Sequence, residues 1–181
     1  SIQAVLRSRG FDNVVLWSRG VDTTVFSCKE AFDYGLKAPI WVYMGRVAVE
    51  KNIEAFLDLD LGGSKVVIGD GPDLDRLKLT YPDCLFVGYK FGHELAAHLA
   101  GADVFVFPSK TDTFGIVLLE AMACGLPVAA YPVTGPVDIV EPGVTGVLED
   151  DLAAACHEAL NINKEDCVKF AAGRSWQRCT E

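Results

Sequence analysis

Short apolar runs recur along the chain and alternate with segments of helical length. Six runs have the length and composition of β-strands: residues 40–45, 65–69, 84–88, 103–108, 127–131 and 146–148. The middle runs are almost continuous Val, Ile, Phe and Ala, which is typical of strands buried on both faces of a parallel sheet. Between the runs, apolar residues such as Ile53, Phe56 and Leu57 repeat at helical spacing. The pattern predicts an α/β fold, a doubly wound, mostly parallel sheet of about six strands.

The two ends of the chain depart from this alternation. Residues 2–9 are predicted to form a short helix and residues 13–17 a strand, before an irregular lead-in. Residues 164–181 have a helical composition that is interrupted at Gly173. Because the last segment has no capping signal and the chain starts with Ser1, we expect an excerpt of a longer protein.

These features divide the chain into three parts. We expect a lead-in and interdomain segment over residues 1–38, a Rossmann-like domain over 39–162, and a C-terminal helix, cut short, over 163–181. The 181 residues are enough for one domain with a real core.

Composition and charge narrow the classes of function. Half of the residues are apolar and 23% are charged, which is typical of a soluble globular domain and not of a disordered chain. The net charge of −9 argues against nucleic acid as a partner and against attraction to anionic lipid. Six cysteines form no CxxC pair and have no histidine at ligand spacing. We therefore predict reduced thiols in a cytoplasmic protein without a structural metal.

Glu120 is the one charged residue between Thr113 and Tyr131. A carboxylate buried there without a partner would cost several kcal/mol. The residues around it, 117–123, are otherwise apolar on nearly every side, so an exposed helix face is disfavoured. We predict that Glu120 lies in a buried helix with one flank at the carboxyl ends of the strands, where doubly wound sheets bind their ligands.

Two cations follow the first predicted strand. Gly45 allows the chain to turn there, and Arg46 and Lys51 then lie near one loop. Such a pair suits a diphosphate, with the guanidinium as a fork and the ammonium as a point charge. The alternative is a solvated Arg46, with Lys51 paired to a neighbouring acid. After the second strand, residues 69–72 lack the third glycine of GxGxxG, so they fit a tight turn as well as a phosphate loop.

The segment after the fourth predicted strand offers another anion site. Backbone N–H groups near Gly115 are unpaired at the positive end of the helix that carries Glu120. Asp112 lies eight residues before Glu120 and outside that helix, so the two carboxylates can approach one cleft from different depths. Asp112 can equally serve as a plain helix cap. Residues 134–136 begin a further short helix, which is either a second N–H cradle or a capped turn.

Six stretches occur in order at the spacing of one enzyme class: GRVAVEKN, VIGDGP, FVGY, ELAAHLAGADVFVFPS, TDTFGIVLLEAMACGLPVAA and TGPVDIVEPGVTGVL. Together they resemble the nucleotide-sugar-binding half of the retaining glycosyltransferases of family 4 (glycosyltransferase group 1), which have the two-domain GT-B fold. The stretch SRGVDTTVF is similar to the interdomain segment of that family. The resemblance covers about residue 14 to the end, and no single motif carries it.

The resemblance implies catalytic roles for three residues. Arg46 and Lys51 match the basic pair that binds the donor diphosphate and stabilises the charge on the leaving nucleotide. Asp112 matches the first residue of an acidic pair and would contact the donor hexose.

The resemblance also implies a set of nucleotide-sugar-binding residues. Glu120, the second acid of the pair, would hold the ribose hydroxyls. The N–H groups around Phe114, Gly115 and Ile116 would face phosphate and sugar. The remaining members are Gly45 and the strand end beside the base, Val87, Gly88 and Tyr89.

The sequence departs from the family pattern at three places. Asp112 stands where most members have Glu, so its side chain is one methylene shorter. Residues 134–136 read TGP where Gly-Gly is common, and Asn52 stands where Gly is usual.

The resemblance implies a full-length hexosyltransferase that uses a UDP-sugar or a GDP-sugar, without cofactor or metal, and transfers to a lipid or glycan acceptor. The partner would be the missing N-terminal, acceptor-binding domain of the same enzyme, through which the protein could associate with a membrane, and the fragment alone would be inactive. Alternatives are a sugar-nucleotide epimerase of GT-B fold and a non-catalytic nucleotide-binding module. The incomplete GxGxxG counts against a dehydrogenase-like dinucleotide binder.

Overall fold

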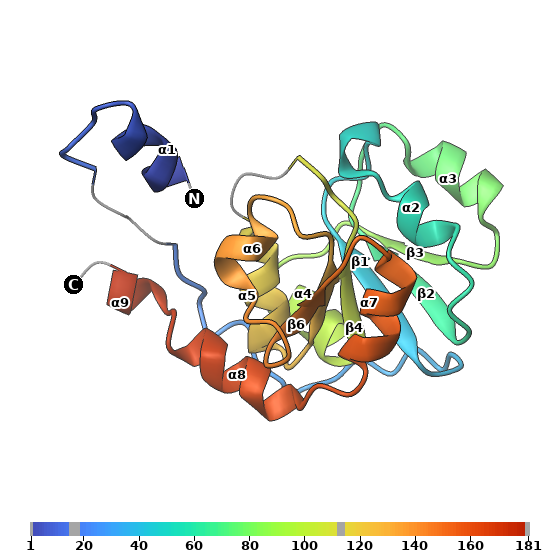
Figure 1. The fold of residues 1–181 in the computed structure, drawn as a ribbon. Helices are drawn as coiled ribbons and strands as arrows, with labels where there is room; N and C mark the ends of the chain where they lie inside the picture. The colour runs from blue at the N-terminus through green and yellow to red at the C-terminus, as the bar shows by residue number, and fades with distance from the viewer. Residues whose placement is uncertain (1, 15–18, 112–114, 180–181) are drawn as a thin grey trace.

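The computed structural model describes residues 2–14, 19–111 and 115–179. Six strands form one sheet, and each neighbouring pair runs parallel in the order β3-β2-β1-β4-β5-β6 (Figure 1). The strands are β1 (Ile40–Met44), β2 (Ser64–Ile68), β3 (Leu85–Gly88), β4 (Val104–Phe107), β5 (Val128–Ala130) and β6 (Gly146–Leu148). The predicted doubly wound parallel sheet is confirmed.

Helical segments follow all six strands and also occur near both ends of the chain. They are α1 (Ile2–Ser8), the 3₁₀ turn η1 (Val49–Lys51), α2 (Glu54–Leu57), α3 (Leu74–Thr80), α4 (Gly92–Ala100), α5 (Ile116–Ala123), α6 (Pro136–Ile139), α7 (Leu152–Ala159), α8 (Lys164–Ala172) and α9 (Trp176–Cys179). The helical spacing of Ile53, Phe56 and Leu57 does not extend back into one long helix, because Asn52 adopts a left-handed φ of 54° that ends η1 before α2 begins.

The two faces of the sheet carry separate apolar cores. Successive residues of β1 point to opposite faces, so Val42 packs with α4, α5 and α8, whereas Trp41 and Tyr43 pack with α2, α3 and α7. The Trp41 indole is fully buried and donates its N–H to the carbonyl of Gly62 at 2.8 Å. Both faces of the sheet are therefore covered, as the continuous apolar strands predicted.

The lead-in contacts the carboxyl-terminal end of α4. The Phe32 amide donates to the carbonyl of Ala97 at 2.9 Å, and the Tyr34 hydroxyl donates to the carbonyl of His98 at 2.9 Å. His98 is buried, and its Nδ1 lies 3.1 Å from the Tyr34 oxygen. Burial lowers the pKa of His98. The lead-in is thus held to the domain by backbone and side-chain contacts.

The two ends of the chain behave differently from the sheet. The predicted N-terminal helix is present as α1, which projects away from the sheet (Figure 1). Residues 13 and 14 are not in a strand, and the rest of the strand predicted at 13–17 lies outside the described residues. The tail divides at Gly173, where α8 ends, and α9 begins three residues later. Over the described ranges, no helix combines the length and the apolar character that crossing a membrane requires.

Candidate functional site

The strand order contains a topological switch point between β1 and β4. From β1 the chain proceeds to β2 and β3 on one side, and β4 leads to β5 and β6 on the other. In such sheets ligands bind in the crevice outside the carboxyl ends of the strands. Asn52 links the two sides of this crevice, because its side-chain amide donates to the carbonyl of Pro108, just after β4, at 3.0 Å. Its left-handed φ also explains why glycine is usual at this position in the family that the sequence resembles.

A cavity of about 450 Å³ opens at the carboxyl ends of β1, β2 and β3, a volume in the range of small-molecule sites. It is lined by residues 44–46, 68–70 and 89–92 from the strand ends, by Leu95 of α4, by Val117 and Glu120 of α5, and by Phe26 of the lead-in. The cavity lies at the edge of the sheet where the sequence predicts ligand binding. The sequence contains no local signal for Phe26, which reaches the cavity from a segment without regular structure.

Glycines bring the loops after these three strands together. The Gly45 amide donates to the carbonyl of Ile68 at 3.0 Å, and the Gly69 amide donates to the carbonyl of Gly88 at 2.9 Å. A Cβ on Gly69 would lie 1.9 Å from the carbonyl oxygen of Gly45, and Gly69 has a φ of +145°. A side chain at Gly69 would force the two loops apart at the base of the cavity. Glycine is therefore required at this position of the GDGP turn, because the backbone of Gly45 approaches too closely for a Cβ.

The Glu120 side chain is half-buried on the cavity wall, as predicted. Burial raises its pKa to about 7. Among the described residues, no side chain or backbone N–H donates a hydrogen bond to its carboxylate. A carboxylate in this position can accept two hydroxyl donors from a ligand, and such donors would favour its ionised form.

The basic pair is divided between the cavity and its margin. Arg46 lines the cavity, is largely exposed, and lies 3.5 Å from the carboxylate of Glu50. Such an exposed ion pair contributes little stability and leaves the guanidinium able to turn toward an anion. Lys51 is the last residue of η1 and lies outside the described cavity lining. The structure therefore places both cations on the loop after β1, at different distances from the cavity.

The strand end β3 and its loop form the far wall of the cavity. Tyr89 lines the cavity and is followed by Lys90 and Phe91, which also line it. The place of Tyr89 beside a base stays a prediction. Val87 packs partly buried against the core, and Gly88 turns the chain with a φ of +75°. Phe91 was not predicted, although its position three residues after the end of β3 was a signal for it.

The start of α5 holds the remaining predicted residues. Gly115 is buried at the N-cap of α5 with a φ of 66°, and Ile116 is the first residue of that helix. Asp112 and Phe114 lie outside the described residues. Helix α5 has eight residues, and no side chain of the described residues caps it at Gly115. The amide of Leu118 donates to the carbonyl of Gly115.

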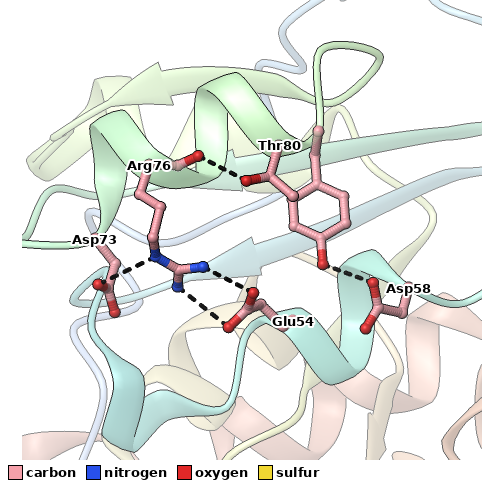
Figure 2. Close-up of polar contacts among 6 residues, drawn as sticks. Glu54, Asp58, Asp73, Arg76 and Thr80 are labelled. Atoms are coloured by element: carbon pink, nitrogen blue, oxygen red, sulfur yellow. Dashed lines mark hydrogen bonds and ion pairs between the residues drawn. The ribbon is translucent and has the colours of Figure 1, made fainter.

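Helices α2 and α3 each follow one of the loops that line the cavity, and Arg76 of α3 bonds to α2. Figure 2 shows the guanidinium of Arg76 donating to both carboxylate oxygens of Glu54, at 2.9 and 3.1 Å, with Asp73 at 3.7 Å. This bidentate pairing lowers the pKa of Glu54. The Tyr81 hydroxyl adds a bond to Asp58 at 2.6 Å. Because each helix follows one of the cavity loops, these contacts join the segments that follow the loops after β1 and β2.

Comparison with known proteins identifies relatives over most of this domain. The family described as Glycosyl transferases group 1 matches residues 38–162. A GDP-mannose-dependent alpha-mannosyltransferase of Mycobacterium tuberculosis (strain CDC 1551 / Oshkosh) is 36% identical over 94% of this chain and 50% of its own length. A protein of the same name from Corynebacterium glutamicum is 35% identical over 80% of this chain and 37% of its own length. The sulfoquinovosyl transferase SQD2 of Arabidopsis thaliana is 36% identical over 74% and 29%. The chain thus spans half or less of these relatives.

Solved structures share the fold. The apo form of the lipopolysaccharide outer core galactosyltransferase WaaB superposes with a TM-score of 0.81 at 17% identity, over 99% of this chain and 58% of that one. The sucrose-phosphate synthase of Thermosynechococcus elongatus superposes with a TM-score of 0.78 at 25% identity, over 98% and 53%.

Proposed function

The chain belongs to the group 1 glycosyl transferases, and on that premise we propose that it forms the donor-binding half of a retaining hexosyltransferase of GT-B fold. The observation that carries this proposal is Glu120, a half-buried carboxylate without a hydrogen-bond donor from the described residues, on the wall of a cavity at the strand ends. The cis-diol of a ribose supplies two such donors. A carboxylate that binds no ligand in this position would only cost desolvation free energy.

The donor we propose is GDP-mannose. Three relatives that are 35–40% identical are named GDP-mannose-dependent alpha-mannosyltransferases. Because the chain spans half or less of those relatives, the acceptor, a lipid or a glycan, would be bound mainly by a further domain of the full-length enzyme.

The roles of the residues follow from charge and position. Departure of the nucleotide places negative charge on the β-phosphate, and Arg46 and Lys51 on the loop after β1 would stabilise it together with the first N–H groups of α5. Glu120 would anchor the ribose. Asp112, which lies outside the described residues, would contact the hexose, as the family resemblance implies. These cations and helix N–H dipoles would provide the stabilisation that a divalent ion provides in other transferases, so we propose a metal-independent reaction.

Titration calorimetry with GDP tests the proposal on this chain. We expect binding by the wild type, a large loss of affinity in Glu120→Gln, and a smaller loss in Asp112→Asn. In the full-length enzyme, Asp112→Asn should instead reduce transfer. The reverse order of binding losses would overturn the two roles, and binding of NAD but not of GDP would overturn the function.

A further inference from the structure

The loop after β3 places two exposed aromatic rings and a lysine, residues 89–91, at the mouth of the cavity. The rings of Tyr89 and Phe91 are 71% and 69% exposed, and they stack on each other with centroids 6.3 Å apart and planes at 26°. Both residues line the cavity. Two exposed, stacked rings at the edge of a ligand site present a flat apolar face of the kind on which nucleobases stack.

Lys90 lies between the two rings in the chain and is held in place. Its side chain is only 23% exposed, and its Nζ lies 2.5 Å from Oε1 of Glu94 in the first turn of α4. An ammonium group has three N–H donors, of which Glu94 takes one. Lys90 therefore brings to the cavity wall a charge whose other two N–H donors find no acceptor among the described residues.

The position of this wall relative to the phosphate site follows from the sheet. The proposed diphosphate site lies at the switch point next to β1, and β3 is two strands away. Neighbouring strands are about 4.8 Å apart, so the end of β3 lies about 10 Å from that of β1. The phosphates and the base of one nucleotide can therefore occupy two ends of this cavity, which Glu120 also lines.

We propose that Lys90, positioned by Glu94 and flanked by Tyr89 and Phe91, makes this site selective for guanine. This inference rests on the proposed function. Guanine presents two adjacent acceptors, O6 and N7, to a lysine ammonium. Adenine presents an amino group in place of O6, which a cation repels, and uracil has no N7 and a smaller face for stacking.

The test is the affinity of the chain for three nucleotides, GDP, ADP and UDP, measured by calorimetry in wild type, Lys90→Gln and Lys90→Arg. We expect the wild type to prefer GDP, and Lys90→Gln to lose at least about fivefold of the preference over UDP and ADP. Lys90→Arg should keep the preference, because a guanidinium also donates to O6 and N7. Lys169→Gln is the matched control, since Lys169 forms ion pairs on α8 away from the cavity.

Two results would overturn the inference and leave the proposed function standing. One is a Lys90→Gln variant that keeps the wild-type preference for GDP. The other is an equal loss of affinity for all three nucleotides, which would place Lys90 at the phosphates. A wild type that prefers UDP overturns guanine selection and GDP-mannose as donor, while a wild type that binds none of the three overturns the proposed function itself.

Discussion

Replacing Glu120 by Gln should stabilise the empty protein at high pH. Burial raises the pKa of Glu120 from an ordinary 4.5 to about 7. Between these values the folded chain holds a proton that the unfolded chain has lost, so stability falls as pH rises through this range. The full shift corresponds to about 3 kcal/mol of folding free energy above pH 7. Because the side chain is only partly buried, solvent screening reduces the expected gain to about 1–3 kcal/mol.

Urea denaturation followed by circular dichroism measures this gain. We expect equal free energies of unfolding for wild type and Glu120→Gln at pH 4, and a difference that grows toward pH 8 in favour of the variant. All other titrating groups are shared and cancel in the difference. A difference that does not change with pH, or a variant that is less stable at pH 8, would refute the assignment of an ionised, unpartnered carboxylate.

Three further predictions concern the ligand and the cavity floor. Nucleotide affinity should increase from pH 6 to pH 8, because ribose hydroxyls favour the ionised form of Glu120. Binding should then release a proton, which calorimetry in buffers of different ionisation enthalpy would detect. An affinity that does not change with pH would contradict this prediction. Gly69→Ala should destabilise the fold by more than about 2 kcal/mol in urea, because its Cβ would lie 1.9 Å from the Gly45 oxygen. Gly62→Ala is the control, since Gly62 also has a positive φ but no atom within 4 Å of the added Cβ, and equal losses would remove the steric argument. EDTA should leave GDP binding unchanged, and loss of binding on chelation would refute metal independence.

The sheet was predictable because each strand is a short apolar run with its own composition. The β1 run, IWVYM, is fully buried over all five residues, and that continuity indicated a parallel sheet before any contact was known. The place of Glu120 was predictable for a related reason, since one charge in an apolar helix needs a ligand or an opening to solvent.

Other features depend on contacts between distant segments. The division of the predicted helix after β1 follows from Asn52, whose left-handed backbone is supported by a bond to Pro108, 56 residues away. Phe26 reaches the cavity from the lead-in, and no local pattern marks it. The pairing of Arg76 with Glu54 joins two helices that are separate in the sequence. Composition and periodicity describe neighbours along the chain, so they do not predict such contacts between distant residues.

Helix α4 has a part in both the cavity and the lead-in. Its first turn places Gly92 and Leu95 on the cavity wall, and its last turn accepts the amide of Phe32 at the carbonyl of Ala97. A nine-residue helix moves as one rod of about 13 Å. If a ligand restricts the motion of one end of this helix, the other end should move less too. A nucleotide in the cavity should therefore slow deuterium uptake at the Phe32 amide, which is bonded to the opposite end of α4.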